Sequence, residues 1–412
     1  SFYLYSEFLM IHKIMRSRDH HEPHRVATTL ELYFDLVFVI AIAATASGLH
    51  HALAAHHFSD GLIRFATSFF CVWWAWMNFT WFASAYDNDD FSYRIVTMVQ
   101  MFGAIILAIG INNVFEHNDY TMILIGYIVM RIAMAYQWFR AAKSDSERRT
   151  TCLRYAFGII IAQLFWAIIV IYIPHLFNQI FLFGALLELS VPVWAESANK
   201  TAWHPHHIAE RYGLLVIIVL GEGILGATNA ITPLFHSNEA ILTEAFPLGL
   251  GISALMFSLW WLYFKMPWGE FLHSQRTLNN ALVYGYGHLL IFIALTALGS
   301  GLELLADSVK EFGTMAEVAE HSTNAHSVSP LFAMTALSLC TAIYLIALAF
   351  LRWYLDKDTN YSVIGFTLAI AATFLGVLCV YLGMPLQWSI WFTVIAPIAM
   401  ISFYKTKPIH LD

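Results

Sequence analysis

Apolar runs of about 20 residues, separated by short polar stretches, recur along the whole 412-residue chain. A helix of about 20 residues spans the hydrocarbon core of a bilayer, and in lipid only helices or closed barrels satisfy their own backbone hydrogen bonds. The runs are too long and too continuously apolar for barrel strands. They predict about twelve transmembrane helices, at residues 29–54, 62–86, 93–114, 120–142, 153–174, 176–197, 211–231, 246–266, 278–305, 329–351, 362–382 and 387–405.

The composition agrees with this pattern. Hydrophobic residues make up 59% of the chain and charged residues only 12%, whereas a soluble domain has roughly 25% charged residues. The four cysteines form no CxxC pair, which argues against a disulfide framework or a cysteine metal site. We therefore expect an all-α polytopic membrane protein that contacts membrane lipids and binds no nucleic acid.

Lys and Arg residues gather on one side of the predicted helices. Of the 21, 18 fall on one side, Arg64 and Lys310 fall on the other, and Arg131 lies within a helix. Because positively charged loops remain cytoplasmic, both termini are expected in the cytoplasm. The acidic loop at residues 306–328 is expected outside.

The first and seventh predicted helices share a motif. "ELYFDLVFVIAIA" begins at Glu31, and "ERYGLLVIIVLGE" begins at Glu210. Aromatic residues recur at one spacing in the helices that follow: Trp73, Trp74, Trp76 and Trp81, then Trp260, Trp261, Tyr263 and Trp268. Chance likeness between apolar runs is the alternative. A duplication predicts two parallel six-helix repeats, at residues 29–197 and 211–405.

Three further segments complete the predicted organisation. Residues 1–28 form an N-terminal cytoplasmic or interfacial segment, in which Leu4, Phe8, Ile11 and Met15 have the spacing of a helix on the membrane surface. Residues 198–210 form a histidine-rich cytoplasmic linker, and residues 406–412 form a cytoplasmic tail.

Three charged residues fall near the middle of predicted helices. Glu222, Arg131 and Glu188 each lie ten to twelve residues from the start of a helix, which is a depth of about 15 Å or slightly more. A charge that faces lipid there costs at least about 2.5–3.5 kcal/mol, so mutual pairing is expected. The pairing would either fix helix register or form a substrate or proton site.

A second charged cluster lies nearer the cytoplasmic ends. It comprises Glu31, Asp35, Asp87, Asp90, Arg94, Glu210 and Arg211. Glu31 and Asp35 are four residues apart and share one helix face. The cluster is expected to be either an interfacial salt-bridge network or a cytoplasmic gate.

Histidines and tryptophans suggest two further sites. His204, His206 and His207, with His20, His21 and His24, would be able to ligate a divalent metal, although solvated loop histidines are the alternative. No cofactor is expected, because haem needs several buried histidines and His288 alone lies deep in a helix. The tryptophans inside helices either pack the core or line a pocket for an organic or cationic ligand: Trp73, Trp74, Trp76, Trp260 and Trp261.

Three segments resemble the bacterial low temperature requirement protein A (LtrA) family: "ELYFDLVFVIAI", "WWAWMNFTWFASAYDNDDFSYRIVTMVQM" and "HHIAERYGLLVIIVLGE". The resemblance is specific over residues 29–226 and diffuse afterwards. Tyr33 stands where the family often has Phe. The resemblance implies a bacterial cytoplasmic (inner) membrane protein, but no particular reaction. The matching positions are Glu31, Phe34, Asp35, Trp76, Trp81, Asp87, Asp89, Asp90, Arg94, His207, Glu210, Arg211, Gly213, Gly221 and Glu222.

Three classes of function follow from these features. The first is a secondary transporter for a small solute or ion, in which Glu222 carries a proton or coordinates substrate, Arg131 is its counter-ion, and the cytoplasmic cluster is the gate. The second is a non-transporting sensor or scaffold, and the third is an integral-membrane enzyme acting on lipid or a redox carrier. A homo-oligomer is compatible with all three. A polar cavity at mid-membrane depth would favour transport, and an interior filled with side chains would favour a scaffold.

Overall fold

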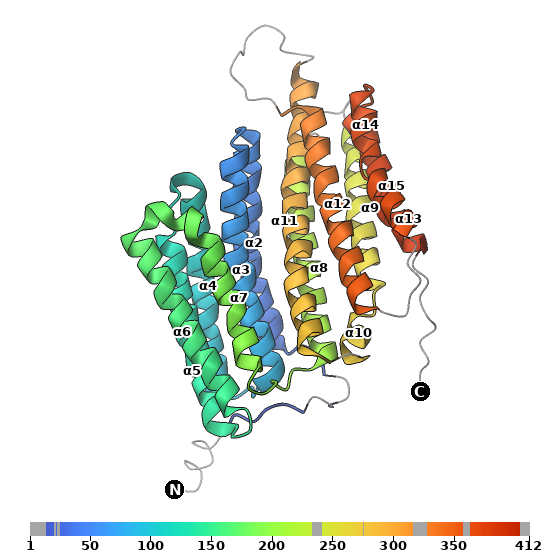
Figure 1. Ribbon diagram of the computed structural model, residues 1–412. Coiled ribbons are helices and arrows are strands. Elements are labelled where there is room, and N and C mark those ends of the chain that lie inside the picture. The colour runs from blue at the N-terminus through green and yellow to red at the C-terminus, as the bar shows by residue number, and fades with distance from the viewer. Residues whose placement is uncertain are drawn as a thin grey trace. The chain divides into compact units, whose positions relative to one another are not determined.

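Every regular element in the described part of the computed structural model is a helix (Figure 1). The structure describes residues 14–19, 22, 25–232, 241–274, 276–315, 328–356 and 363–403. Three predicted features lie outside these ranges: the surface helix except for Met15, the histidines at 20, 21 and 24, and the tail at 406–412. The α-helices are α2 (Thr29–Ala54), α3 (Phe58–Tyr86), α4 (Phe91–His117), α5 (Thr121–Ser144), α6 (Arg149–Tyr172), α7 (Phe177–Glu196), α8 (Pro205–Ile231), α9 (Phe246–Phe264), α10 (Trp268–Ser274), α11 (Leu278–Met315), α12 (Pro330–Leu355), α13 (Val363–Ala372), α14 (Leu375–Tyr381) and α15 (Leu386–Phe403). A 3-10 helix, Pro174–Leu176, precedes α7, and a π-helix, Ile241–Ala245, precedes α9.

Each predicted apolar run coincides with helical structure. The run at 362–382 is divided into α13 and α14, and α11 continues ten residues beyond the expected end at 305. Among the described residues, eight helical segments are long and apolar enough to cross a membrane. This composition is that of a polytopic membrane protein, whereas the number of twelve crossings and the two repeats remain predictions.

The chain divides into two compact units. The first contains Ser1–Gly48, Ser59–Leu214 and Leu272–Ala281, so it holds α3 to α7 with the first parts of α2 and α8. The second contains Leu49–Phe58, Leu215–Phe271 and Leu282–Asp412, so it holds α9 and α12 to α15 with most of α11. The predicted boundaries at 197 and 211 remain a prediction.

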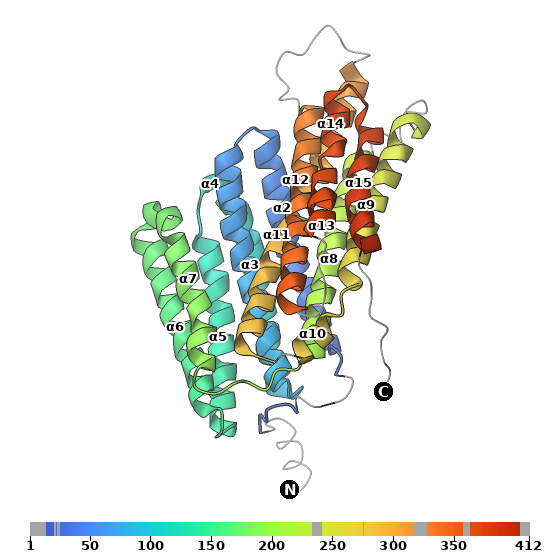
Figure 2. The same ribbon diagram turned by 45° about the vertical axis from the view of Figure 1, so that its right-hand side comes forward.

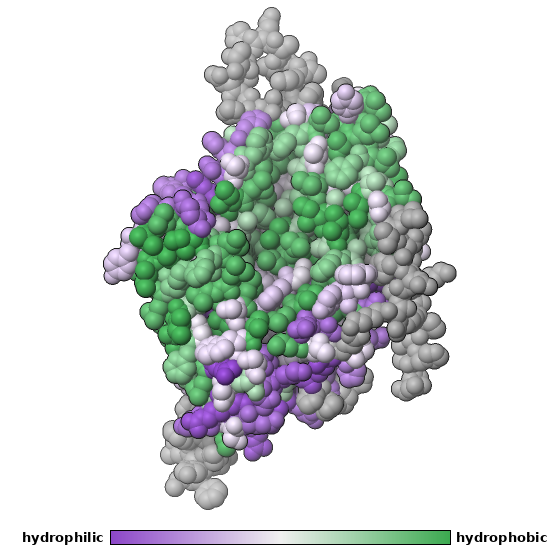
Figure 3. All heavy atoms as spheres, in the orientation of Figure 1, coloured by the Kyte–Doolittle hydropathy of each residue, from purple (hydrophilic) through white to green (hydrophobic). Residues whose placement is uncertain are grey.

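In the first unit, α4 to α7 run side by side (Figure 1). The backbones of α4 and α5 approach closely where Gly103 meets Gly126, because neither residue has a side chain to separate them. Hydrophobic residues cover the sides of α6 and α7, and hydrophilic residues gather at their ends (Figure 3). Apolar side chains that face outward, such as Phe102 and Leu164, suit contact with lipid acyl chains.

In the second unit, α9 packs along α15, and α13 also lies against α15 (Figure 2). Its interior contains His288, which is fully buried as the sequence predicts. The imidazole Nδ1–H of His288 donates to the carbonyl oxygen of Tyr284, 2.7 Å away, and its Nε2 accepts from the hydroxyl of Tyr263, 3.0 Å away. Both ring nitrogens are therefore satisfied by the protein, as a structural core histidine requires.

Replacing Gly126 with Ala tests the close approach of α4 and α5. A Cβ atom at Gly126 would lie 2.6 Å from the carbonyl oxygen of Gly103, so the helices must separate. We expect a loss of about 1–3 kcal/mol in the free energy of unfolding, measured by SDS titration in bicelles. Gly221→Ala is the matched control, since its Cβ would meet no atom within 4 Å. Equal losses in both variants would contradict the packing described here.

Candidate functional site

A buried ion pair joins α5 to α7 within the first unit. One NH2 group of the Arg131 guanidinium donates to Glu188 Oε2 at 2.9 Å, and the indole Nε1–H of Trp74 donates to the same oxygen at 2.8 Å. Both charged side chains are almost completely buried. The Arg131 guanidinium also lies over the ring of Tyr127, 5.3 Å from its centroid. The sequence predicts pairing of Arg131 with Glu222, Glu188 or both, and the structure shows Glu188 as one partner.

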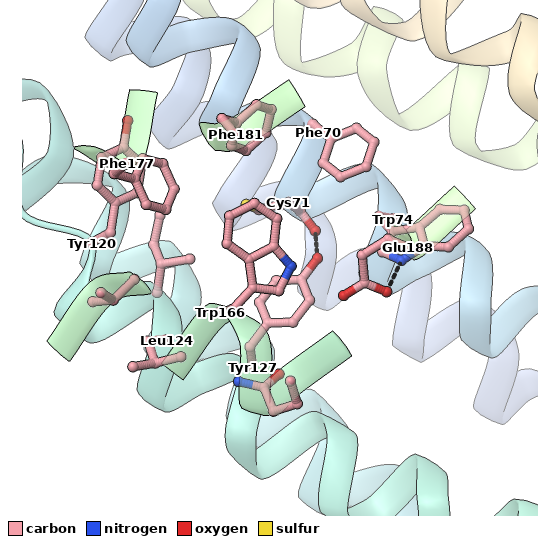
Figure 4. A pocket seen from close by; sticks show the side chains of 13 residues that line it. Phe70, Cys71, Trp74, Tyr120, Leu124, Tyr127, Trp166, Phe177, Phe181 and Glu188 are labelled. Carbon is pink, nitrogen blue, oxygen red and sulfur yellow. Dashed lines mark hydrogen bonds between the residues drawn. The ribbon is translucent and has the colours of Figure 1, made fainter. Parts of the chain in front are cut away.

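A cavity begins beside this ion pair and runs between α3, α5, α6 and α7. Tyr120 and Phe177 lie at one end of it and Trp74 and Glu188 at the other (Figure 4). About 430 Å³ within this lining is unfilled, including the open mouth, and about 30 Å³ of it can hold the centre of a water molecule. Its lining is chiefly aromatic: Phe70, Trp74, Tyr120, Tyr127, Trp166, Phe177 and Phe181.

Two polar side chains in this aromatic lining have unmet hydrogen-bonding capacity. Glu188 is 1% exposed, and its Oε1 has no hydrogen-bond partner. Gln163 on α6 is 9% exposed, and neither its Oε1 nor its Nε2 has a partner. Buried polar groups in native proteins are nearly always paired, so these three atoms mark the cavity as a place where a further group belongs.

A second buried network joins α2 to α8, also within the first unit. The Arg211 guanidinium binds Asp35 with two hydrogen bonds, from Nε at 3.1 Å and from NH2 at 2.6 Å. Its NH1 lies 3.1 Å from Glu31, whose carboxylate also contacts His207 Nε2 at 3.2 Å. Trp76 donates its indole N–H to Asp35 at 2.7 Å. All four charged or titratable side chains are fully buried, so this half of the predicted cytoplasmic cluster is brought together.

The start of α2 explains how Glu31 is positioned. Thr28 precedes the helix, its backbone N–H donates to Glu31 Oε2 at 2.7 Å, and its hydroxyl accepts from the Glu31 N–H at 3.3 Å. This reciprocal arrangement is a capping box, encoded by the spacing T-x-x-E. The carboxylate of Glu210 accepts the backbone N–H of Ala27, which precedes Thr28, at 3.0 Å. Glu210 is therefore part of the α2–α8 junction.

The acidic loop between α3 and α4 contacts Arg140 and Arg94. Asp90 is the N-cap of α4 and accepts the N–H of Tyr93 at 2.8 Å. Burial opposes its ionisation, but hydrogen bonds from Arg140 and from the Tyr93 backbone outweigh that effect and lower the pKa of Asp90. Arg94 pairs with Asp89 at 2.7 Å on the exposed surface. The structure thus places Arg94 outside the buried α2–α8 network.

Asp87 lies in the same loop and is buried. Its Oδ1 accepts the backbone N–H of Asp89 at 3.0 Å. Burial, followed by the negative charge of Glu31, raises the pKa of Asp87 from an ordinary 3.8 to about 6, against the opposing attraction of Arg25. Arg25 donates to the carbonyl oxygens of Ser84 and Ala83 at the end of α3.

The linker histidines bond to the backbone and to Glu31. His204 Nε2–H donates to the carbonyl oxygen of Glu22 at 2.9 Å, and its Nδ1 accepts the N–H of His207 at 3.3 Å. Burial lowers the pKa of His204, which suits this neutral form. The described ranges contain no group of three His, Cys, Asp or Glu residues placed to hold a metal ion. The adventitious metal predicted at His204, His206 and His207 remains a prediction.

The five candidate tryptophans have different environments. Trp73, Trp74 and Trp76 are each 1% exposed. Trp74 lines the cavity, and Trp76 supports Asp35. Trp260 and Trp261 are 43% and 59% exposed and do not line the aromatic cavity. Two aligned pairs of the predicted repeats, Trp73 with Trp260 and Trp74 with Trp261, therefore differ in burial, whereas Trp76 and Tyr263 are both buried.

Glu222 lies in the second unit, whereas Arg131 and Glu188 lie in the first. Glu222 is half-buried, and Glu303 on α11 is close enough for its charge to oppose that of Glu222. Glu303 fits against Gly226, which has no side chain in its way. His50 contacts Glu303 at 3.3 Å and Asp307 at 2.8 Å. His50 thus contacts two carboxylates of this group, and the pairing of Glu222 with Arg131 or Glu188 stays a prediction.

Several residues of these clusters were not singled out from the sequence. Arg140, the partner of Asp90, is 50 residues away on another helix and resembles an ordinary loop-flanking basic residue. Gln163 carries no charge and lies in an apolar run, so only its polarity amid hydrophobic residues distinguishes it in the sequence. Glu303 lies near the end of the predicted helix at 278–305, and like Glu222 it is a carboxylate within an apolar run.

Removing one partner of the α5–α7 ion pair tests its burial. Arg131→Met leaves the Glu188 carboxylate buried and uncompensated, so we expect a loss of about 3–5 kcal/mol in the free energy of unfolding, measured by SDS titration. Adding Glu188→Leu should restore most of that loss. Arg94→Ala, in the exposed pair with Asp89, is the control and should cause no measurable loss. If the double variant is no more stable than Arg131→Met, the two residues do not form the pair described.

The raised pKa of Asp87 predicts how stability depends on pH. Because the folded state binds this proton more tightly than the unfolded state, stability should fall as pH rises from about 4 to about 6, by about 3 kcal/mol for a shift of about two pH units. Asp87→Asn removes the titrating group, so its stability relative to wild type should increase over that range. Thermal unfolding of both proteins from pH 4 to pH 7 measures the difference, and a pH-independent difference would contradict the assignment.

Comparison with known sequences adds a family and one relative. The sequence model described as bacterial low temperature requirement A protein (LtrA) matches residues 26–399, well beyond the range 29–226 that carries the motifs. The chain is 28% identical to the uncharacterized protein RA0937 of Rhizobium meliloti over 298 residues, which cover 66% of the chain and 68% of that protein. No solved structure matches the chain.

Proposed function

The chain belongs to the bacterial low temperature requirement A family, and from that premise we propose that it is a proton-coupled secondary transporter for a small solute or ion. The solute contacts Glu188, which Arg131 holds in place at mid-membrane depth. Glu222 carries the coupling proton. The protein lies in the bacterial cytoplasmic membrane with both termini inside, crosses it twelve times, and consists of two parallel six-helix repeats.

One observation carries this proposal: the cavity that ends at the open oxygen of Glu188. A scaffold or sensor would be expected to fill the same space with side chains. Glu188 lies eleven residues into α7, about 17 Å along the helix axis. The cavity runs to this depth from Tyr120 and Phe177, at the helix ends that the distribution of Lys and Arg assigns to the outside. This cavity is the path by which, in this proposal, a solute reaches a polar group inside the membrane.

The carboxylates of the second unit supply a place for the proton. Glu222 and Glu303 oppose each other's charge, and a single His50 contacts Glu303 and Asp307. Two carboxylates that share a low-dielectric site favour a state in which one of them is protonated. A carboxylate that gains and loses a proton inside apolar helices is the usual carrier in proton-coupled transport.

The network of Glu31, Asp35 and Arg211 serves as the inner gate in this proposal. It consists of charge-assisted hydrogen bonds in a fully buried setting, which hold the start of α2 against α8. Asp87, Asp90, Arg94 and Glu210 anchor the neighbouring loop and helix starts. Membrane lipids surround the protein, which is free to form a homo-oligomer.

Proton movement by the Glu222→Gln variant tests the function. Purified protein is reconstituted into vesicles that contain a pH-sensitive dye, and small amines, amino acids, sugars and inorganic ions are added outside in turn. We expect at least one class to drive proton movement in wild type and none to do so in Glu222→Gln, because the amide cannot carry a proton.

Glu270→Gln is the matched control, since it makes the same change on the exposed surface of α10. It should retain wild-type proton movement. Coupled movement that persists in Glu222→Gln would contradict the role of Glu222. If no solute class drives protons in wild type, proton coupling is wrong.

A further inference from the structure

Two acceptor oxygens that line the aromatic cavity, one from Glu188 and one from Gln163, have no hydrogen-bond partner. Glu188 Oε2 already accepts from Arg131 and Trp74, whereas its Oε1 accepts nothing. Gln163 offers one more free acceptor and an amide nitrogen with two free N–H donors. A ligand that satisfies this cavity therefore carries at least one O–H or N–H group directed at Glu188.

The charge balance of the cavity selects a neutral ligand. The Arg131 guanidinium lies 2.9 Å from Glu188 and neutralises it, and both side chains are almost completely buried. A cation would add an uncompensated charge beside Arg131, and an anion would add one beside Glu188. Either is unfavourable in a low-dielectric interior, despite the affinity of aromatic faces for cations.

The aromatic lining of the cavity favours a small ring. Of its unfilled space, only about 30 Å³ can hold the centre of a water molecule, so there is room for a small group alone. Phe70 and Trp74 stack on each other, with 6.1 Å between their ring centroids, and Phe181 meets Phe70 edge-on at 85°. A single aromatic ring makes stacked and edge-on contacts with such walls.

We propose that this cavity binds a small neutral molecule made of one flat apolar ring and a hydroxyl or N–H donor. The donor binds Glu188 Oε1, the amide of Gln163 binds the same polar group, and the ring lies among Phe70, Trp74, Trp166 and Phe181. This inference rests on the proposed function in taking Glu188 as the residue that contacts the solute, and it adds the chemical class of that solute.

Binding of three matched probes to the full chain in lipid nanodiscs tests the ligand class. Phenol has the ring and the donor, toluene has the ring alone, and benzylamine carries a positive charge at pH 7. We expect phenol to bind at least about tenfold more tightly than toluene, because one hydrogen bond to a charged group is lost, and more tightly than benzylamine. Calorimetry against empty nanodiscs measures the three affinities. Equal affinity for toluene, or tighter binding of benzylamine, would overturn the proposal.

Two variants place the binding in this cavity. Gln163→Leu removes an unpartnered amide and should fold, yet weaken phenol binding about fivefold or more. Gln137→Leu is the matched control, because Gln137 is also fully buried with an unpartnered amide but does not line the cavity. If Gln163→Leu folds poorly, Val170→Trp, which fills the cavity, should abolish phenol binding. Unchanged phenol binding in Gln163→Leu or Val170→Trp, or equal weakening by Gln137→Leu, would overturn the proposal.

The equilibrium measurement separates this inference from the proposed function, because binding to purified protein requires no flux. If the protein binds phenol as expected but moves no solute, the inferred ligand class holds and the proposed transport is wrong. If the protein shows proton-coupled transport but binds phenol and toluene equally, only the inferred ligand class is wrong.

Discussion

A charge inside a lipid bilayer must find its partner within the protein, and this constraint organises the first unit of the chain. Arg211 satisfies it with Asp35 and Glu31, and in doing so fastens the start of α2 to α8. Arg131 satisfies it with Glu188 between α5 and α7. Each pair joins two helices at a fixed register, since a shift by one residue would leave a buried charge without its partner.

The same constraint also shows where function is to be sought. In the pair of Arg211 with Asp35, both carboxylate oxygens of Asp35 accept hydrogen bonds from the guanidinium. Glu188 instead keeps one oxygen open to an aromatic cavity. In the second unit, Glu222 has Glu303 as a neighbour, and a like charge there favours protonation of one of the two. An open acceptor and two neighbouring carboxylates are the groups that a solute and a proton can use.

The helices were predictable from the sequence because an apolar run of sufficient length is a strong local signal, and each predicted run proved helical. The partners of charges were only partly predictable. The pairing of Arg131 with Glu188 follows from matched depth and opposite sign, whereas that of Asp90 with Arg140 depends on how two helices turn about their axes. Burial of tryptophans was not predictable either. Trp74 and Trp261 lie in similar motifs, yet only Trp74 is buried, because helices that are apolar on every face do not reveal which face packs inward.

Access to the cavity from each side of the membrane tests the central claim most directly. Cys71 lines the cavity and serves as the probe once Cys152, Cys340 and Cys379 are replaced by Ala. A small membrane-impermeant thiol reagent is added to one side of sealed vesicles of known protein orientation, and then to the other. For a transporter that opens alternately to the two sides, we expect Cys71 to be labelled from both. Labelling from neither side would contradict transport through this cavity and leave the Arg131–Glu188 pair with a structural role.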